Sequence, residues 1–413
     1  MLSQRAQTNS RWSEQQHDHQ LRLQQGSKFV LGLDPIDVTT TEDWLIRDEL
    51  LALCSEAAVR DSTAHQSSYS SGLGSTADFL GRAAAFFNHF FQPTRPVMSD
   101  NIVIGTGSSA MLATLIHDIC DQGEGLLVDL PMWNETHSSQ PRQIQPPAHE
   151  GEEVGWPVCF EMSCILRNEV RLVPGLMAEQ ICDPQVCVAQ LRDAVRGAGC
   201  KVRGLLFRNP PTSCGQPYGS EYIKALLRFC EEEDLHLISD ETYALSILSR
   251  EPSSSRFTSV LELDLERLGV MAGCVHVFYD ISKSFGSTGL RMVIPSVATL
   301  LIDADRLQGF VITQTNHVLR RLLSFSNSTT FSTASLATTA LLFSNVEKLD
   351  ALLRVNRVRL KEAADVVMGF ATYYKIAFYR PVAGVYIWLR LGGTLGITKE
   401  EEKELEAKCA SNG

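Results

Sequence analysis

A single lysine, Lys283, stands among small and apolar residues in the segment YDISKSFGSTGLR, residues 279–291. A lysine becomes a nucleophile when its surroundings remove water from the ammonium group, and it then forms Schiff bases with carbonyl compounds. Arg291 follows eight positions later and carries the type of side chain that holds an anion. Alone, such residues more often belong to a charged surface, so their meaning depends on the other motifs.

Two further segments favour a site for a charged, aromatic cofactor. Asp240 ends the apolar run LHLIS, where a carboxylate is costly unless a cation meets it. A protonated pyridine nitrogen is such a cation, and an acid beside it keeps the ring protonated as an electron sink. The segment GTGSSA leads into a helical pattern, so its N–H groups and the hydroxyls of Ser108 and Ser109 suit a phosphate. By itself, this turn more often is a plain strand-to-helix connection.

Three other side chains offer contacts to a flat ring. Trp133, after Pro131, provides an aromatic face for stacking, although most tryptophans belong to the core. Asn209 in RNPP and Tyr243 in SDETY each provide a hydrogen bond for a ring oxygen. An aldehyde on lysine, a ring nitrogen on aspartate and a phosphate at a helix start together describe pyridoxal 5′-phosphate (PLP). The sequence therefore predicts PLP as the cofactor.

The segments that must position these residues alternate between strand and helix periods. Buried strands are predicted at the start of 101–121 and within 123–131, 202–211, 235–243 and 274–282, and helices at 42–60, 77–91 and 221–234. Strands separated by helices indicate a mostly parallel sheet with both faces covered. Ligands gather at the carboxyl ends of such strands, and every motif above stands at such an end.

In order and content, GTGSSA, PMW, NPP, SDETY and SKSFGSTGLR resemble the fold-type I aminotransferases of classes I and II. The lysine segment is most similar to the 1-aminocyclopropane-1-carboxylate (ACC) synthase-like branch, whose fungal relatives include carbon–sulfur lyases. The resemblance covers about residues 28–412 and implies an α/β, PLP-dependent transferase fold of type I. The expected organisation is an N-terminal arm (1–45), a large PLP-binding domain (46–315, with a loop insertion at 137–157) and a small α+β C-terminal domain (316–413).

The resemblance also implies a role for each matched residue. Lys283 corresponds to the Schiff-base lysine and Asp240 to the partner of the pyridinium nitrogen. The pair that hydrogen-bonds the ring 3′-oxygen corresponds to Asn209 and Tyr243. Phosphate-binding positions fall on Ser108, Ser109 and Arg291, the stacking aromatic on Trp133, and Tyr69 on a tyrosine that reaches the neighbouring subunit's phosphate. A homodimer is therefore expected.

Two departures from the family pattern affect these expectations. The family usually has a serine that touches the phosphate three residues before the lysine, where this chain has Asp280. A carboxylate repels a phosphate, so we expect weaker PLP binding unless Asp280 turns away or Ser282 substitutes for the missing serine. The family also continues beyond EEKELEAKCASNG into a strand with an arginine for the substrate carboxylate, so the C-terminal domain is expected to be truncated.

Composition limits the remaining function classes. The 413 residues carry a net charge of −11, which argues against a nucleic-acid surface. No run approaches the apolar length of a membrane span, and no secretory signal stands at the start. The 11 cysteines form no C-x-x-C pair and the histidines lack metal-ligand spacing. These features predict free thiols, no metal site and a cytoplasmic location.

The sequence thus predicts a PLP-dependent aminotransferase that acts on an amino acid or amino-acid conjugate, in secondary metabolism. A carbon–sulfur lyase or an ACC synthase-type lyase is the alternative, because the same residues serve elimination. A third reading is a PLP-type scaffold without turnover, which Asp280 and the missing C-terminal strand favour.

Overall fold

The computed structural model describes residues 43, 45–50, 52, 73–130, 164, 165, 167–177, 183–212, 215–248, 256–285, 308–327, 339, 342–390 and 401. Two compact units are distinguished. One consists of residues 42–364 and 380–386, and the other includes residues 365–379 and 387–390. The predicted boundaries at residues 45 and 315 remain predictions, and the predicted insertion at 137–157 lies outside the described residues.

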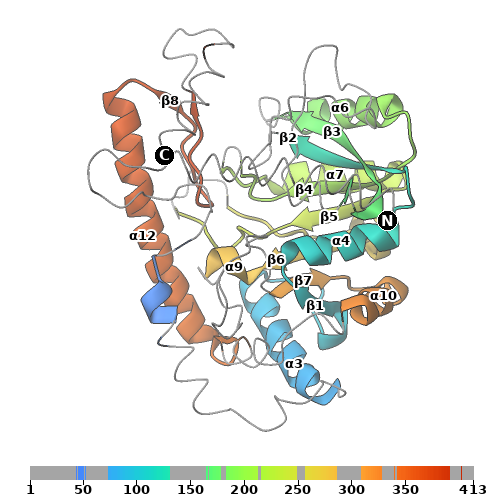
Figure 1. Ribbon diagram of the computed structural model, residues 1–413, viewed down its shortest axis with the longest axis horizontal. Coiled ribbons are helices and arrows are strands. Elements are labelled where there is room, and N and C mark those ends of the chain that lie inside the picture. The colour runs from blue at the N-terminus through green and yellow to red at the C-terminus, as the bar shows by residue number, and fades with distance from the viewer. Residues whose placement is uncertain are drawn as a thin grey trace, which may run out of the picture. The chain divides into compact units, whose positions relative to one another are not determined.

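A seven-stranded sheet forms the centre of the first unit (Figure 1). Its strand order is β1-β7-β6-β5-β4-β2-β3, and only the pairings of β7 with β1 and β6 are antiparallel. The strands are β1 (Ile102–Thr106), β2 (Gly125–Leu130), β3 (Arg171–Met177), β4 (Val202–Arg208), β5 (His236–Asp240), β6 (Val275–Asp280) and β7 (Gln308–Ile312). The predicted mostly parallel sheet is confirmed.

Helices and short helical turns connect these strands. They are α3 (Leu73–Phe90), η2 (Ser99–Asn101), α4 (Ser108–Ile119), α6 (Pro184–Gly197), α7 (Ser220–Glu232), η5 (Val260–Glu262), α8 (Leu265–Leu268), η6 (Ala272–Cys274), α9 (Ile281–Ser284) and α10 (His317–Asn327). The predicted helices at 77–91 and 221–234 are confirmed as α3 and α7. Of the helix predicted at 42–60, residues 43, 45–50 and 52 are described. Residues 47–50 and 52 are helical, and residues 45 and 46 form a turn.

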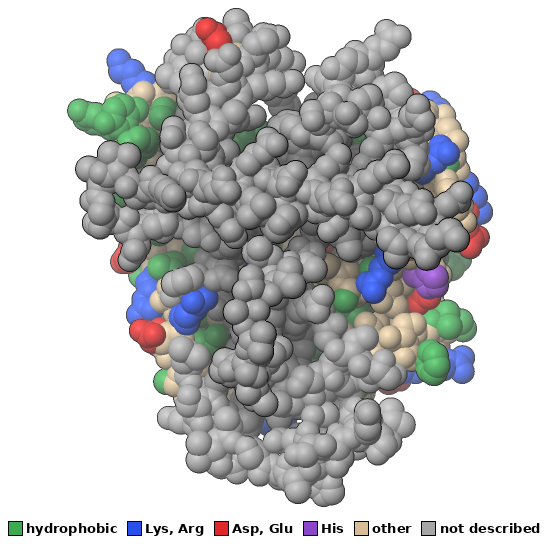
Figure 2. All heavy atoms as spheres, in the orientation of Figure 1, with side chains coloured by type: hydrophobic (Ala, Val, Ile, Leu, Met, Phe, Trp, Pro, Cys, Tyr) green, Lys and Arg blue, Asp and Glu red, His purple; other side chains and the backbone are tan. Residues whose placement is uncertain are grey.

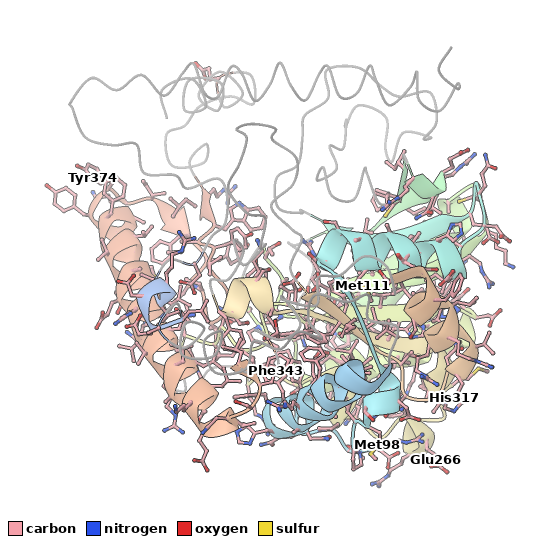
Figure 3. All side chains as sticks on the ribbon, turned by 60° about the horizontal axis from the view of Figure 1, so that its bottom comes forward. Met98, Met111, Glu266, His317, Phe343 and Tyr374 are labelled. Atoms are coloured by element: carbon pink, nitrogen blue, oxygen red, sulfur yellow. The ribbon has the colours of Figure 1, made fainter. Side chains whose placement is uncertain are left out.

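Two apolar clusters cover the two faces of the sheet. On one face, aromatic side chains of α3 pack against Tyr279 of β6 and Phe310 of β7. Phe86 of α3 stacks on Phe343 at 4.5 Å between ring centroids, and Figure 3 labels Phe343. On the other face, Met111 of α4 lies in a cluster with Phe278 and Val311. Burial of these large side chains provides the main driving force for the fold.

In the second unit, the described residues include the end of α12 (Val346–Tyr373) and a two-stranded antiparallel sheet. Its strands are β8 (Ala377–Phe378) and β9 (Leu389–Arg390). The Tyr379 N–H donates to the Trp388 carbonyl at 3.1 Å, and the two rings lie 5.7 Å apart. A long helix and strands in this part of the chain agree with the predicted C-terminal pattern, while its predicted truncation remains a prediction.

On the face drawn in Figure 2, the described side chains show no strong segregation of charge. Lys and Arg side chains lie among Asp, Glu and apolar side chains on the described parts of the face in Figure 2. None of the described helices combines the length and apolar character that a bilayer span requires.

Candidate active site

Strand register brings three of the predicted site segments to one edge of the sheet. Arg208, the last residue of β4, pairs with Asp240, the last residue of β5, and Asp240 pairs with Phe278 of β6. Side chains alternate between faces along a strand, so Phe278 and Asp280 share one face. Phe278 packs in the same cluster as Met111 of α4. Asp280 therefore points to the side of the sheet on which α4 lies.

The lysine follows directly. Lys283 lies in the single helical turn α9, which begins directly after β6. Its side chain is half-buried, while its neighbours Ser282 and Ser284 are buried. The next residue, Ser284, is held through its carbonyl by the Asn356 carboxamide at 3.2 Å, and the same carboxamide donates to the buried carboxylate of Asp43 at 2.7 Å. These contacts fix α9 to α12 and to the segment around residue 43. They therefore hold the backbone next to Lys283 in place.

Asp280 is the N-cap residue of α9 and is fully buried. Its Oδ1 accepts a hydrogen bond from the Ser282 N–H at 2.7 Å, and its Oδ2 accepts one from the Ser108 N–H at 3.1 Å. One carboxylate thus joins the first turn of α9 to the first turn of α4. The sequence left open whether Asp280 turns away from the predicted phosphate position; the structure places it at the helix start that carries Ser108.

The turn before α4 depends on two glycines. Gly107 precedes the helix with φ of 81°, in the region that favours glycine. At Gly105, an added Cβ would lie 2.1 Å from Met111 Sδ and 2.7 Å from Asn327 Oδ1. These constraints explain the GTG pattern without any ligand, and they bring the N–H groups of α4 to the same edge as Asp280. Ser108 and Ser109, both partly exposed, begin that helix.

Asp240 is half-buried and lies near two buried charged side chains, those of Arg208 and Asp129. Its Oδ1 accepts hydrogen bonds from Thr242 Oγ1 at 2.6 Å and from the Thr242 N–H at 3.1 Å. Arg208 Nε donates to Asp129 Oδ1 at 3.1 Å, and both side chains are buried. Burial raises the pKa of the Asp240 carboxyl above its ordinary value, although the Thr242 hydrogen bonds and the Arg208 charge lower it. Asp129, Arg208 and Asp240, when ionised, sum to one negative charge, so a further cation would balance them.

Asn209 and Tyr243 occupy different environments. Asn209 is fully buried, its Oδ1 accepts from the Tyr218 N–H at 3.1 Å, and its Nδ2 donates to the Thr258 carbonyl at 2.9 Å. Its amide therefore ties two backbone segments together in this structure. The Tyr243 hydroxyl lies 3.1 Å from the Tyr386 hydroxyl. The predicted contacts of both residues with a ring oxygen remain predictions.

Other predicted site residues are outside the described part of the chain: Tyr69, Trp133 and Arg291. Conversely, the structure adds Arg208, Asp129 and Tyr386, which sequence reasoning missed. The separation of 79 residues between Arg208 and Asp129 leaves no local signal for their pairing. The sequence did offer one hint. Arg208 ends the apolar strand β4, and burying a charged side chain there costs free energy unless the charge is paired.

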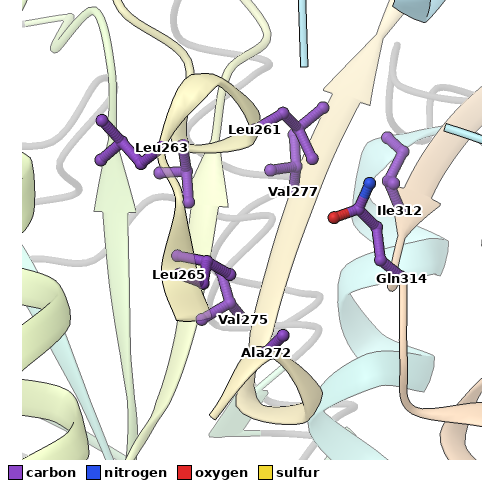
Figure 4. Close-up of a pocket in the computed structure, with 9 residues that line it drawn as sticks. Leu261, Leu263, Leu265, Ala272, Val275, Val277, Ile312 and Gln314 are labelled. Atoms are coloured by element: carbon purple, nitrogen blue, oxygen red, sulfur yellow. The ribbon is translucent and has the colours of Figure 1, made fainter. Parts of the chain in front are cut away.

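Other features of the described chain offer less chemistry. Its described Asp, Glu, His and Cys residues form no cluster that would hold a metal ion. A pocket at the start of β6 and the end of β7 has apolar side chains from Leu261, Val275 and Ile312 and one amide, Gln314 (Figure 4). Gln314 Nε2 donates to the Arg95 carbonyl at 2.8 Å. None of its lining residues is charged, so this pocket does not suit a charged substrate.

Comparison with known proteins shows the family to which the chain belongs. The family model "Aminotransferase class I and II" matches residues 178–412. The aminotransferase verI of Clonostachys rogersoniana is 35% identical over 100% of this chain and 84% of its own length. This chain is a class I and II aminotransferase. The probable aminotransferase gliI of Aspergillus fumigatus is 34% identical over 95% of this chain and 81% of its own length.

More distant relatives and solved structures extend the likeness. The 1-aminocyclopropane-1-carboxylate synthase 7 of Arabidopsis thaliana is 26% identical over 74% of this chain and 60% of its own length. An aspartate aminotransferase of Thermus thermophilus superposes with a TM-score of 0.62, at 18% identity, over 94% of this chain and 85% of that chain. A PLP-bound C-S lyase of Staphylococcus hominis superposes with a TM-score of 0.59, at 16% identity, over 84% and 71%. These structures confirm the fold of type I.

The aminotransferase is a PLP-dependent transaminase, and its own residues can be tested against that cofactor. Ser282 Oγ is buried and has no hydrogen-bond partner among the described residues, as expected of a hydroxyl placed for a ligand. The hydrogen bonds that Thr242 gives to Asp240 both reach Oδ1, which leaves Oδ2 for a protonated ring nitrogen. The ring-binding part of the edge fits PLP. At the start of α4 the fit is poorer, because a carboxylate already meets the Ser108 N–H.

Proposed function

We propose that this aminotransferase converts an amino acid or amino-acid conjugate, with Lys283 as the residue that holds PLP covalently and moves the substrate proton. When bound, PLP supplies an electron sink for the charge that forms at the substrate α-carbon. The observation that carries the proposal is the placement of Lys283, Asp240 and Ser108 at the same edge of the sheet. That edge is where ligands bind in open α/β sheets.

Each residue has a distinct task in this proposal. Once the substrate amine had displaced Lys283 from the cofactor, the freed Lys283 amine would accept the α-proton as general base and return it as general acid. Asp240, held by Thr242, keeps the proton on the ring nitrogen, while Tyr243 donates a hydrogen bond to the ring oxygen. Ser108, Ser109, Ser282 and Arg291 contact the phosphate, Asn209 supports the ring contact, and Trp133 stacks on the ring. Tyr69 reaches the neighbouring subunit's site in a homodimer.

The test begins with absorption spectra of the purified protein after PLP addition and desalting, before and after borohydride. We expect a retained band near the visible edge that borohydride fixes onto the peptide containing Lys283. Lys283→Ala should lose that band while remaining folded, and Lys224→Ala, a change on the outer helix α7, should keep it. A band that survives in Lys283→Ala would exclude the lysine assignment.

Product analysis then separates transamination from elimination. Formation of a 2-oxo acid together with pyridoxamine phosphate supports the proposal. Release of ammonia with pyruvate or a thiol would instead support a lyase, an alternative favoured by the relative from Arabidopsis thaliana that is named as an ACC synthase. We also propose a role in secondary metabolism and a cytoplasmic location. The chain's similarity to two fungal aminotransferases supports the enzyme class on which the first proposal rests.

A scaffold without turnover is the second candidate function, and Asp280 is the observation that favours it. A similar protein of Mus musculus, 25% identical over 92% of this chain and 60% of its own length, is named a probable inactive ACC synthase-like protein. A folded protein that binds neither PLP nor pyridoxal would support this candidate. Binding without any product from a panel of amino acids would support it only for the substrates tried.

A further inference from the structure

The buried carboxylate of Asp280 lies between the first turns of two helices. It accepts the Ser108 N–H of α4 at 3.1 Å and the Ser282 N–H of α9 at 2.7 Å. Figure 1 shows α9 and the start of α4 next to each other, at the carboxyl ends of the parallel strands. The direction of this side chain follows from strand alternation, because Phe278, two residues earlier, packs on the α4 side of β6.

Asp280 accepts a hydrogen bond from the Ser108 N–H, a donor that would otherwise be available to an anionic ligand. The first N–H groups of a helix have no partner within the helix, and the helix dipole adds positive potential there. Helix α4 has 12 residues, no acidic residue in its first turn and no side-chain cap from Gly107. Asp280 supplies the missing anion from a separate strand, so the start of α4 is already partly neutralised by the chain itself.

We propose that Asp280 is a specificity-determining residue: its carboxylate competes with the cofactor's phosphate group for the N–H groups at the start of α4. It thereby lowers the affinity for PLP relative to pyridoxal, which lacks the phosphate. This inference rests on the proposed function, which places that phosphate at the start of α4. A phosphate monoester carries about two negative charges at neutral pH. A carboxylate fixed at the same N–H groups repels it, and burial of the Asp280 side chain reduces the screening of this repulsion by water. The buried hydroxyl of Ser282 adds a neutral contact but does not remove the charge.

The same carboxylate stabilises the protein without cofactor. It caps both helices at once, and N-cap side chains typically contribute about 1 kcal/mol each to stability. Asparagine and serine also cap helices, but neither offers two charged oxygens for the two N–H groups. A neutral side chain at position 280 should therefore make the cofactor-free protein less stable and the PLP-bound protein relatively more stable. Asp280 thus stabilises the cofactor-free protein and lowers its affinity for PLP.

The experiment compares PLP with pyridoxal, which lacks the phosphate, in wild type, Asp280→Asn and Asp280→Ser. Dissociation constants come from absorbance or fluorescence titration, and unfolding temperatures are measured with and without each ligand. We expect both variants to bind PLP at least about tenfold more tightly than wild type, with less than a twofold change for pyridoxal. The PLP-induced rise in unfolding temperature should also be larger in the variants.

Asp183→Asn is the matched control, because Asp183 caps α6 by accepting the Gln185 N–H at 2.8 Å and is exposed. It should leave both dissociation constants unchanged. Equal PLP affinity in wild type and the Asp280 variants would overturn the inference while leaving the proposed function intact. Failure of every protein to bind either ligand would instead count against the proposed function.

A measurement on wild type alone keeps the inference testable if both variants fail to fold. The inference expects wild type to prefer PLP over pyridoxal by less than about tenfold. A preference of about 100-fold or more would show that the carboxylate does not oppose the phosphate, and would overturn it.

Discussion

The Tyr243 and Tyr386 hydroxyl oxygens lie 3.1 Å apart, although 143 residues separate them in the sequence. Their rings meet edge to face with centroids 5.7 Å apart. Backbone hydrogen bonds hold the two segments together: Leu248 N–H donates to the Val382 carbonyl at 2.7 Å, and Gly384 N–H to the Ser246 carbonyl at 2.9 Å. Tyr386 is therefore positioned to orient the Tyr243 hydroxyl, which is proposed to contact the ring oxygen of PLP.

Replacing Tyr386 by Phe removes this hydrogen bond and keeps the ring packing. One such bond contributes about 0.5–1.5 kcal/mol, so we expect turnover to fall roughly 2- to 10-fold. Because Tyr243 is proposed to touch the cofactor, the absorption maximum of bound PLP should shift in the same variant. Tyr379→Phe, a change at an exposed tyrosine of the second unit, is the control and should leave both unchanged. A turnover loss without a spectral shift would argue against an effect through Tyr243.

The segment that carries Tyr386 is fixed by Gly215, which accepts hydrogen bonds from the Val382 and Ala383 N–H groups at 3.0 and 2.9 Å. Gly215 has φ of 61°, and an added Cβ would lie 2.7 Å from the Ala383 carbonyl oxygen. Gly215→Ala should cost about 1–2 kcal/mol from its backbone conformation alone, and the clash should displace residues 380–386. We expect lower stability in chemical denaturation together with the spectral shift predicted for Tyr386→Phe.

Gly219 provides a matched control for this substitution. It lies four residues later, and an added Cβ would meet no atom within 4 Å. Gly219→Ala should therefore be close to wild type in both measurements. If the two alanine variants behaved alike, the close approach of residue 383 to Gly215 would not explain the effect.

Sequence patterns located much of the sheet because its central strands are buried on both faces. Strand β6 is buried along its whole length, and such runs stand out as continuous apolar segments. Strand β3 escaped notice because it contains Pro174 and Gly175, which weaken a strand pattern and are tolerated at a sheet edge. Strand β7 has five residues and is the antiparallel member, so no helix-strand alternation marks it.

The candidate site was predictable only where its residues stand at strand ends. Lys283 and Asp240 follow apolar runs, and the structure brings them to one edge. The direction of Asp280, the pairing of Arg208 with Asp129 and the contact of Tyr386 with Tyr243 depend on register and on contacts across 79 to 172 residues. Local sequence carries no information about such distances, so these features required the fold.

Asp240 offers a test of the balance between stability and activity. Burial raises the pKa of its carboxyl, so in the cofactor-free protein the ionised form destabilises the folded state as pH rises above the ordinary value of 3.8. Asp240→Asn removes that charge and keeps an oxygen for the Thr242 donors. We expect the cofactor-free variant to unfold at a higher temperature than wild type at pH 7, with the difference shrinking toward pH 4. Its turnover should fall at least about 100-fold, because the ring proton loses its partner.

Asp129→Asn is the contrasting variant for this prediction. It neutralises the partner of Arg208, whose side chain is buried, and leaves the guanidinium without a balancing charge at 3.1 Å. Breaking a buried pair in this way costs about 3 kcal/mol or more. Because Asp129 accepts the Arg208 hydrogen bond directly, Asp240→Asn and Asp129→Asn should change the stability of the cofactor-free protein in opposite directions. A shared direction would contradict the importance of this direct pair.

Glu241 predicts a pH dependence of stability that is separate from the cofactor. Its carboxylate is fully buried; Oε1 accepts from Ser239 Oγ and the Val260 N–H, both at 2.9 Å, and Oε2 accepts from Ser259 Oγ at 2.6 Å. Burial raises the pKa of Glu241 from 4.5 to about 7, against the effect of these hydrogen bonds. The folded state thus binds the proton more tightly than the unfolded state, so stability falls as pH rises from about 4.5 to about 7.

Glu241→Gln keeps the shape and the carbonyl acceptor but cannot ionise. We expect the unfolding free energy of wild type to decrease between pH 4.5 and 7 by roughly 3 kcal/mol more than that of Glu241→Gln. Denaturant unfolding at pH 4.5, 5.5, 6.5 and 7.5 measures the difference, and the other titrating groups cancel because both proteins share them. Glu266→Gln, at an exposed position, is the control and should reproduce the wild-type slope. If Glu241→Gln also retained the wild-type slope, Glu241 would be ionised in the folded state throughout the range, and its three donors would outweigh its burial.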